Sequence, residues 1–545
     1  MRRLATARVV RKKPQDSYAL QLYRIEQSHA DKERKAKLVA PPVAPAPKVE
    51  PKPVRRRQAL SVFQKARIAQ TMETYSPTEF SALGVWSPLE ARLKRLGMLT
   101  ATQVQYKMIP ELLEELGHMG SKPMAFNPTA ALRRTYFVQS PTGSGKTLSY
   151  LVPVIDNLLR KAFAERLAAG VHTLILAPTR ELCIQINSHV AKFLDKPPGF
   201  QGALGPKYLF LDDFRSTEEL HEAFTDTNPS LVIVTPKTLL RYFSVDNASG
   251  FRRLVRSTMT DIHGSFEVPR EFQRISCVIM DECDSILSPL NKYAPLKKVL
   301  VRMRHPKSGE ELLNVLLRFS DPLLIAVSAT MNSQFRHLLH RRGWCVDSRV
   351  VVCKHGEHYT SVPRQIKHRA VGLWEDTPEF VGASLWHTFR NVDGSIPTLV
   401  VVPSSYSLVN LASQLQTYEI KCFLLHETFK SSRPSQSSSP SNEVDRPNLF
   451  SRISAEFESG HIEMMITTYE TVRGIDFSWL RSVYLIHPPK TKASVYIHCA
   501  GRTGRNGLEG TVTSFVLKNQ KVSFMNMLKS KLGVSVQEIP LPRLF

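Results

Sequence analysis

Three acidic side chains at the end of an apolar run are the part of this sequence best suited to chemistry. Residues 275–280 (ISCVIM) have the length and character of a buried strand, and Asp281, Glu282 and Asp284 follow directly, with Cys283 among them. Carboxylates held this close repel one another unless a cation lies between them. The segment therefore predicts a site for a positively charged group at the end of a strand.

A glycine-rich loop earlier in the chain identifies that cation. Residues 140–147 (SPTGSGKT) follow a predicted strand and open a predicted helix. In such a loop the glycines let successive amides point at one anion, and the helix N-terminus adds partial positive charge. The lysine would reach the β- and γ-phosphates of a nucleoside triphosphate, and the threonine hydroxyl would bind Mg²⁺. The predicted nucleotide contacts are Ser140, Pro141, Thr142, Gly143, Ser144, Gly145, Lys146 and Thr147.

The loop and the acidic segment together predict nucleotide hydrolysis. A second parallel strand would deliver Asp281 beside Thr147, and these two residues are the predicted Mg²⁺ ligands, partly through water. Glu282 would polarise a water molecule for attack on the γ-phosphate. Lys146, Asp281 and Glu282 are therefore predicted to be catalytic.

A basic turn late in the chain, residues 498–507 (HCAGRTGRNG), offers Arg502 and Arg505. An arginine pair can stabilise charge on the γ-phosphate, an effect of about 10³–10⁵ in rate where such residues are known. If both come from a second domain, hydrolysis requires the two domains to close. The alternative for either arginine alone is a solvated basic turn or a phosphate contact to RNA.

The elements that must position these residues alternate between short apolar strands and helices. This alternation is typical of βαβ units on a parallel sheet, with function at the carboxyl ends of the strands. It restarts after about residue 355, so we expect an α/β protein of two domains, 76–355 and 356–545. The predicted strands lie within residues 135–140, 172–180, 230–236, 275–282 and 322–330, and then within 398–405, 422–427, 463–469, 482–489 and 510–517.

Composition excludes several classes of protein. Hydrophobic residues make up 42% of the 545, but no apolar run approaches the ~18–20 residues that span a bilayer, so we expect no membrane segment. The seven cysteines include no CxxC pair, which argues against a structural metal site or a disulfide framework. A serine-rich stretch in the second domain, 428–446, is predicted to be a disordered insertion.

The net charge of +25 indicates a polyanionic partner. Residues 1–70 hold 18 basic and 5 acidic residues, which is +13 of that charge. The first 15 residues are Arg-rich and free of acids, as in a mitochondrial presequence. A basic tail that binds RNA or directs nuclear import is the alternative, and the arginines at 55–57 favour it. We expect residues 1–75 to be a presequence and a disordered, Pro-rich extension.

Together these motifs resemble those of the DEAD-box RNA helicases across residues 80–520. The segment 280–284 (MDECD) stands where that family has Asp-Glu-Ala-Asp, with Cys283 in place of alanine. The resemblance implies two tandem RecA-like domains with parallel sheets, in the P-loop NTPase class of helicase superfamily two. It also implies ATP hydrolysis that depends on RNA.

The resemblance implies roles for further residues. Gln105, with Phe80 upstream, would read adenine and so select ATP, and Asp476 would contact the ribose. The SAT segment, 328–330, would couple hydrolysis to unwinding. The implied coupling residues are Asp284, Ser328, Thr330 and His498, and the implied RNA contacts are Pro178, Thr179, Arg180, Thr235, Pro236, Thr468 and Gly474.

Departures from the family pattern concern mainly the RNA side. The segment 235–239 (TPKTL) lacks the usual Gly-Arg, Tyr469 stands where aspartate is usual, and Cys499 replaces an arginine. These changes weaken the expectation of strong unwinding more than that of ATP binding.

We therefore expect an ATP-dependent RNA helicase, with ATP and Mg²⁺ as cofactors, that remodels short RNA duplexes or RNA–protein complexes as a monomer. The presequence and serine-rich insertion resemble those of the fungal mitochondrial member of the family linked with assembly of the large mitoribosomal subunit. That likeness implies ribosomal RNA as the partner and the mitochondrial matrix as the location, with the nucleus as the alternative. The chief rival is an ATP-switched RNA clamp without strand separation, and a DNA helicase is a distant third.

Overall fold

The computed structural model describes residues 76–118, 134–194, 206–211, 217–245, 269–290, 293–331, 333–345, 347–352, 362–363, 365–425, 453–472, 477, 479–489, 493–505 and 508–541. The predicted presequence and extension (1–75), the serine-rich stretch (428–446), Gly474 and Asp476 lie outside the described residues. Below, the first lobe means the described residues of 76–352, and the second lobe those of 362–541. Within this described part, no helix combines the length and apolar character required to cross a bilayer.

The first lobe contains a seven-stranded sheet whose strand pairs are all parallel, in the order β3-β4-β2-β5-β6-β1-β7. Its central strands are buried along their whole length and are apolar except for Thr173, Asp281 and Ser328, as expected where helices cover both faces. The strands are β1 Arg134–Gln139, β2 Thr173–Leu176, β3 Tyr208–Phe210, β4 Leu231–Val234, β5 Cys277–Asp281, β6 Leu323–Ser328 and β7 Asp347–Val352.

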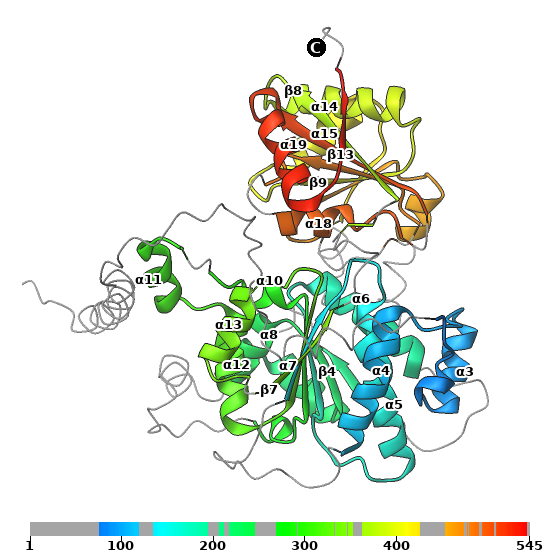
Figure 1. Cartoon of the computed structure of the whole chain (residues 1–545), viewed down its shortest axis with the longest axis vertical. Helices are drawn as coiled ribbons and strands as arrows, with labels where there is room; N and C mark the ends of the chain where they lie inside the picture. The colour runs from blue at the N-terminus through cyan, green and yellow to red at the C-terminus, as the bar shows by residue number, and fades with distance from the viewer. Residues whose placement is uncertain are drawn as a thin grey trace, which may run out of the picture. The chain divides into compact units, whose positions relative to one another are not determined.

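Helices lie on the two faces of this sheet and form two apolar cores with it (Figure 1). One core takes side chains from α3 (Ser87–Arg95), α4 (Gln103–His118), α5 (Lys146–Phe163) and α6 (Arg180–Leu194). The other takes side chains from α7 (Thr217–Thr227), α8 (Pro236–Val245), α10 (Cys283–Leu287), α12 (Ser308–Phe319) and α13 (Ser333–Arg341). The remaining helical elements are α11 (Leu296–Arg304) and the short 3₁₀ turns η2 (Ser81–Leu83) and η3 (Arg270–Phe272).

The second lobe repeats this plan with a parallel sheet in the order β10-β11-β9-β12-β13-β8-β14. Its strands are β8 Ile366–Leu373, β9 Thr398–Val402, β10 Cys422–Leu424, β11 Met464–Thr468, β12 Ser482–Ile486, β13 Gly510–Leu517 and β14 Val536–Ile539. The helices are α14 Pro378–His387, which continues into a π-helical turn η4 Thr388–Val392, then α15 Leu408–Thr417, α18 Ala493–Ala500 and α19 Lys518–Leu532.

The predicted fold class is confirmed, and each of the ten predicted strands is present. Four strands were not predicted: β3, β7, β8 and β14. Three of them lie at a sheet edge and pair with a neighbouring strand on one side only. An edge strand therefore need not be a continuous apolar run in the sequence. The fourth, β8, carries Lys367, His368 and Arg369 in its first half, which hides its strand character.

Candidate active site

The order of strands divides the carboxyl edge of the first sheet into two parts. Strands β5, β6 and β1 are neighbours, and Asp281, Ser328 and the loop that begins at Ser140 follow from their ends. Strands β4 and β2 are also neighbours, so the segments that begin at Thr235 and Pro178 lie next to each other. We call these the nucleotide part and the RNA part of the edge, after the predicted roles of their residues.

The glycine-rich loop is held by contacts from its own lysine. Gly143 and Gly145 have φ of 74° and 85°, a left-handed backbone that favours glycine. The Lys146 ammonium is buried and donates to the carbonyl oxygens of Ser140, at 3.1 Å, and Pro141, at 2.8 Å. Burial lowers the pKa of Lys146, and the nearby carboxylates of Glu282 and Asp281 oppose that shift. The lysine is thus placed among the atoms of the loop itself.

The middle of the loop is held by Ser140 of the loop itself and by Thr102 and Gln105 from outside it. The Ser140 hydroxyl donates to that of Ser144 at 2.7 Å, and Thr102 Oγ1 donates to the Ser144 carbonyl at 2.7 Å. Gln105 donates through Nε2 to the Gly145 carbonyl at 3.2 Å and accepts at 2.9 Å from the Thr102 amide. The structure therefore places the predicted adenine reader, Gln105, against the loop.

Phe80, predicted from the resemblance to contact the nucleotide, is only 1% exposed and lies in the apolar core beside α4 and α5. Leu83 of η2 and Val104 of α4 belong to the same core. The contact of Phe80 with the nucleotide stays a prediction.

Asp281 is the centre of the nucleotide part. Its Oδ2 accepts from Thr147 Oγ1 at 3.2 Å and from the Tyr150 hydroxyl at 2.8 Å. Burial raises the pKa of Asp281 to about 6, and the charge of Glu282 adds to the shift. A cation at this carboxylate would favour its ionised form again.

Glu282 has an unusual backbone for a residue with a side chain. Its φ of 49° lies in the left-handed region, and its amide donates to Asp281 Oδ1 at 2.9 Å. Such strain often occurs at functional sites. Glu282 Oε2 and the hydroxyl of Thr142 are both buried and lack a hydrogen-bond partner among the described residues. Both atoms could bond to a ligand or a water molecule.

The residues of the nucleotide part fit magnesium and a triphosphate. Thr147 and Asp281 present two oxygen atoms, the ligands that Mg²⁺ prefers. Glu282, Asp284 and His498 also offer ligand atoms within 4.8 Å of one another. The magnesium prediction stays with Thr147 and Asp281, because Thr147 belongs to the glycine-rich loop that would hold the phosphates.

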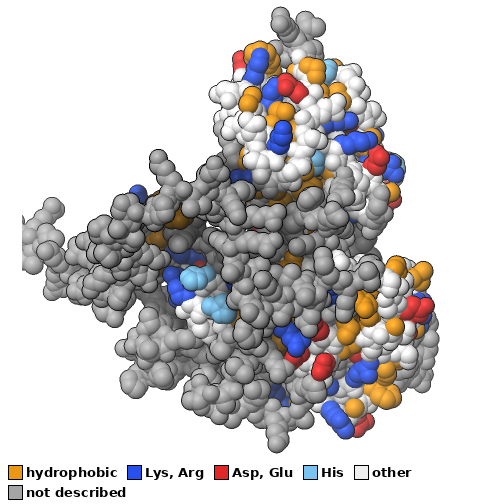
Figure 2. All heavy atoms as spheres, in the orientation of Figure 1, with side chains coloured by type: hydrophobic (Ala, Val, Ile, Leu, Met, Phe, Trp, Pro, Cys, Tyr) orange, Lys and Arg blue, Asp and Glu red, His pale blue; other side chains and the backbone are white. Residues whose placement is uncertain are grey.

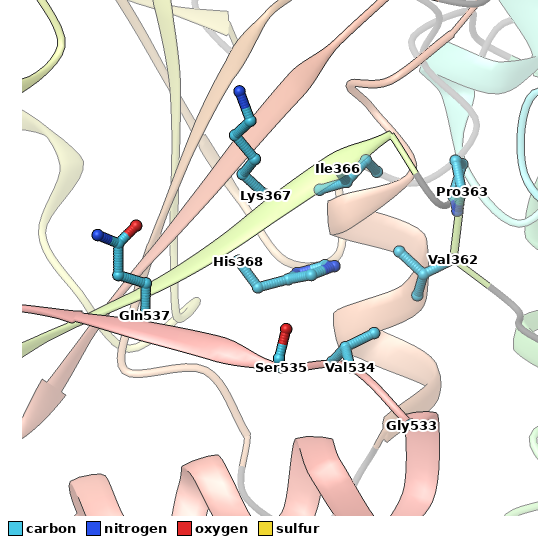
Figure 3. A pocket seen from close by; sticks show the side chains of 9 residues that line it. All are labelled: Val362, Pro363, Ile366, Lys367, His368, Gly533, Val534, Ser535 and Gln537. Atoms are coloured by element: carbon cyan, nitrogen blue, oxygen red, sulfur yellow. The ribbon is translucent and has the colours of Figure 1, made fainter.

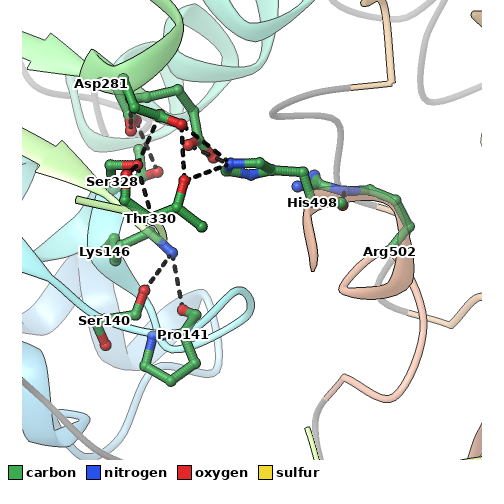
Figure 4. A network of polar contacts seen from close by, with 11 residues as sticks. Ser140, Pro141, Lys146, Asp281, Ser328, Thr330, His498 and Arg502 are labelled. Carbon is green, nitrogen blue, oxygen red and sulfur yellow. Dashed lines mark hydrogen bonds and ion pairs between the residues drawn. The ribbon is translucent and has the colours of Figure 1, made fainter. Parts of the chain in front are cut away.

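The predicted coupling residues form one network (Figure 4). Asp284 accepts from Ser328 Oγ at 2.8 Å and from Thr330 Oγ1 at 2.7 Å. Thr330 Oγ1 also lies 3.2 Å from Nε2 of His498, a fully buried residue of the second lobe. Nδ1 of the same imidazole is 3.6 Å from Glu282 Oε2. The network therefore joins the acidic segment, the SAT segment and the basic turn.

The predicted arginine pair lies in the same turn as Gly501. Arg502 is 2% exposed and donates through Nε to the His498 carbonyl at 2.8 Å, whereas Arg505 donates through Nε to the Gly501 carbonyl at 2.9 Å. Their charges help to lower the pKa of Lys146, so both guanidinium groups lie near the glycine-rich loop. A Cβ atom on Gly501 would lie 1.8 Å from Thr142 Oγ1, which shows how closely the turn meets this loop.

The RNA part is built from helix starts. Thr179 Oγ1 accepts from the Leu182 amide at 3.4 Å, and Thr235 Oγ1 accepts from the Thr238 amide at 3.4 Å. In the second lobe Thr468 accepts from the Thr471 amide at 3.3 Å. Helix starts bind phosphate through free amides. The other predicted contacts are placed at these starts: Pro178 and Arg180 are half-buried, and Pro236 is buried.

The residues that depart from the family pattern point inward. Tyr469 is 6% exposed, packs in an apolar core of the second lobe and donates its hydroxyl to the Ile486 carbonyl at 3.0 Å. Cys499 lies in the same core, and Cys283 lies in a core of the first lobe. Lys237, in contrast, is exposed at the start of α8. Neither of the inward-pointing residues of the second lobe can take over a polar surface contact.

The sequence analysis missed Tyr150 and Gly501. Tyr150 follows Thr147 by three residues on α5, so both side chains lie on one face of the helix. That spacing could have suggested the shared contact to Asp281. Gly501 carried no such signal, because its partner, Thr142, is distant in the sequence.

A pocket of about 450 Å³ lies at the start of β8 and β14 in the second lobe (Figure 3). None of the predicted site residues lines it. His368 points into this region and its Nδ1 is 2.7 Å from the Tyr496 hydroxyl. Burial lowers the pKa of His368 to about 4.

Two family models match the chain in sequence. The DEAD/DEAH box helicase model matches residues 102–338, and the helicase conserved C-terminal domain model matches residues 394–507. Together these segments cover most of both lobes.

The chain is similar to curated fungal proteins. It is 23% identical over 445 residues to the ATP-dependent rRNA helicase SPB4 of Saccharomyces cerevisiae, covering 80% of this chain and 64% of the relative. It is 24% identical over 492 residues to the mitochondrial ATP-dependent RNA helicase MSS116 of Lodderomyces elongisporus, covering 87% of this chain and 60% of the relative. The chain thus spans less than two thirds of the length of these relatives.

Among solved structures, the fold resembles that of Mss116p bound to single-stranded RNA and AMP-PNP. The TM-score is 0.62 at 17% identity, with 87% of this chain and 81% of the other covered. The likeness shows the shared fold.

Proposed function

Because this chain belongs to the DEAD-box family of RNA helicases, we propose that it is an RNA-dependent ATPase that remodels short RNA duplexes or RNA–protein complexes. The observation that carries this proposal is the network of Asp284, Ser328, Thr330 and His498. It links the acidic segment to the second lobe through partly buried polar contacts. A change in the bound nucleotide would thereby alter contacts in both lobes.

Each polar residue of the nucleotide part has a place in the proposed reaction. Thr147 and Asp281 would hold Mg²⁺, which would neutralise charge on the phosphates. Glu282 orients the attacking water through its buried Oε2. Lys146 moves from the loop carbonyls to the phosphates, and Arg502 and Arg505 stabilise the charge that develops. Asp476 is proposed to contact the ribose.

RNA would bind at the RNA part of the edge and at Thr468 and Gly474 of the second lobe. The N-termini of α6 and α8 carry the partial positive charge of the helix dipole, which suits phosphates, so we expect contacts to the RNA backbone without sequence preference. The boundary between the two domains would lie between residues 355 and 356. ATP and RNA would each tighten the binding of the other by the same factor.

The finer proposal is a role in the assembly of the large ribosomal subunit in the mitochondrial matrix, as a monomer. Two observations support it: the Arg-rich, acid-free start of the sequence, and relatives named as an rRNA helicase and as a mitochondrial RNA helicase. The nucleus is the alternative location. Ribosomal RNA in assembly intermediates would be the substrate.

A second candidate function is an RNA clamp that ATP switches without strand separation. The inward-pointing Tyr469 and Cys499 favour it, because the second lobe then lacks two polar side chains that the family pattern has at these positions. A strand-displacement assay on a short RNA duplex separates the two candidates.

The test is ATP hydrolysis by the full chain with no nucleic acid, with single-stranded RNA and with DNA of the same sequence. The proposal predicts turnover that RNA stimulates and DNA does not, with loss on the order of 10²–10³-fold in Glu282→Gln. ATP binding without turnover under any condition would favour the clamp. Equal stimulation by RNA and DNA would contradict the proposed substrate.

A further inference from the structure

A basic surface of the first lobe takes no part in the proposed nucleotide and RNA contacts. It is formed by α11 with the residues that follow it and by α13, and we call it the α11–α13 face. In Figure 2, Lys, Arg and His side chains gather where α13 lies in Figure 1. The basic side chains that are exposed on this face are Lys297, Lys298, Arg304, Lys307, Arg336 and Arg341, with His337 and His340 beside them.

In the sequence around α11 and around α13, basic residues occur without acidic ones. Residues 285–309 contain six basic and no acidic residues, and residues 322–346 contain three basic and no acidic residues. Elsewhere on this lobe acids accompany the bases, as in α3, where Lys94 pairs with Glu90 and Glu79. A solvated face that needs no ligand usually mixes both signs.

A single buried carboxylate brings the two segments together. Glu310, which is 3% exposed at the start of α12, accepts from Arg302 Nε at 2.8 Å and from Arg342 Nη2 at 3.4 Å. Arg302 belongs to α11, and Arg342 directly follows α13. Because both guanidinium groups meet one carboxylate, the ends of these two helices lie side by side.

Helix α11 is attached by polar contacts and adds nothing to the cores. It has no buried residue, although Leu296, Val299 and Leu300 are apolar. Arg302 ties it down by donating to the carbonyls of Leu287 and Ser288 as well as to Glu310. The lysines of α11 therefore remain in solvent, where they can meet a large ligand without a change in the core.

The α11–α13 face adjoins both the acidic segment, 281–284, and the SAT segment, 328–330. Leu287 ends α10, which begins at Cys283 directly after the catalytic acids. Helix α13 starts at Ser333, three residues after Thr330 of the coupling network. A ligand on this face would thus lie next to the working parts without touching them.

We propose that the α11–α13 face is a second RNA-binding surface, which takes the phosphate backbone of a folded, double-stranded region that flanks the strand held at the RNA part. This inference rests on the proposed function. Double-stranded RNA presents phosphates on both sides of a groove, and point charges on two adjacent helices can reach them. Lysines bind such phosphates without reading sequence.

The experiment compares two double variants with equal charge changes. Lys297→Gln/Lys298→Gln removes two exposed lysines from α11, and Lys529→Gln/Lys531→Gln removes two exposed lysines from α19 in the second lobe. The probe is an RNA hairpin of about 20 base pairs with a single-stranded tail of about 12 nucleotides, beside the tail alone. Kd is measured by fluorescence anisotropy over a range of salt concentrations, with the full chain.

The α11 variant is expected to bind the hairpin about fivefold or more weakly, and to reduce the slope of log Kd against log salt by about 2. Its affinity for the tail and its ATP turnover with the tail should equal those of the wild type and of the α19 variant. Arg341→Gln, on α13, should weaken hairpin binding in the same direction by a smaller factor. A thermal melt of each variant checks that it folds.

Three results would overturn the proposal. The hairpin could bind the α11 variant as tightly as the wild type, or both double variants could weaken it equally, which would be an effect of net charge. The α11 variant could instead lose affinity for poly-glutamate or for anionic vesicles while keeping that for the hairpin. A different observation would contradict the proposed function, namely that no RNA stimulates ATP turnover by the wild type.

Discussion

Along the carboxyl edge of the first sheet, the nucleotide part ends in buried side chains that bond to one another, whereas the RNA part ends in threonines that cap helices. Asp281 takes hydrogen bonds from Thr147 and Tyr150, and Asp284 takes them from Ser328 and Thr330. Thr179 and Thr235 accept hydrogen bonds from amides of their own helix starts. In the nucleotide part, side chains bond to one another, and in the RNA part the threonines bond to backbone amides of their own helices.

The difference bears on one departure from the family pattern, Lys237 at the start of α8. A catalytic carboxylate works only in one position and one ionisation state, so each residue in its network constrains the next. Backbone amides at helix starts bind phosphate whatever the neighbouring side chains are. Lys237, at the start of α8, can therefore replace the usual residue without dismantling the site.

The largest effect is expected when the family residue is restored. Tyr469→Asp would place a carboxylate in the apolar core of the second lobe and remove the hydrogen bond to the Ile486 carbonyl. The free energy of unfolding should fall by about 3 kcal/mol or more. Tyr469→Phe, the matched control, should cost about 1 kcal/mol. Chemical denaturation of the two variants measures both, and a stable Tyr469→Asp with stronger RNA stimulation would break the comparison.

Gly501→Ala tests whether the nucleotide part needs the turn of the second lobe. The new Cβ would lie 1.8 Å from Thr142 Oγ1, so the turn and the glycine-rich loop must move apart. We expect RNA-stimulated ATP turnover to fall on the order of 10²-fold. Gly117→Ala on α4, where a Cβ meets nothing within 4 Å, is the control and should leave turnover unchanged. Normal turnover in Gly501→Ala would show that hydrolysis does not require this contact.

Lowering the pH should change the free energy of unfolding in opposite directions through Asp281 and through His368. The pKa of Asp281 is raised to about 6, so its protonation below that pH relieves a buried charge. The pKa of His368 is lowered to about 4, so between pH 6.5 and 4 the unfolded chain binds the proton and the second lobe loses stability.

For His368 this loss between pH 7 and pH 5 is about 2 kcal/mol by linkage. His368→Gln should remove that part of the pH dependence, measured by denaturation at both pH values. His305→Gln, at an exposed histidine of the first lobe, is the control and should keep it. An unchanged pH dependence in His368→Gln would mean that the imidazole is not held neutral in the fold.

Tyr150→Phe should have the smallest effect. The hydroxyl stabilises the ionised form of Asp281, so without it the pKa of Asp281 rises further. At pH 6.5 the concentration of Mg²⁺ needed for half-maximal turnover should rise about threefold, and at pH 8 it should hardly change. Tyr136→Phe, at another buried tyrosine of this lobe, is the control. Equal shifts at both pH values would assign the hydroxyl to packing instead.

Much of the fold was accessible from the sequence because the chemistry is local. Apolar runs of strand length predicted ten strands, and the glycine-rich loop and the acidic segment each carry their residue types in a short stretch. Helix spacing and strand ends obey fixed periods, so a reader of the sequence can place Thr147 at a helix start and Asp281 at a strand end.

Tertiary structure alone decided which ends meet. The order β5-β6-β1 brings Asp281, Ser328 and the glycine-rich loop together, and β8 became a strand because β13 and β14 lie on either side of it. Whether Tyr469 faces solvent or the core, and whether Glu310 gathers α11 and α13, depends on contacts between residues far apart in the sequence. A residue's type and its near neighbours determine what it can bond to, but the packing of distant segments determines which partner it has.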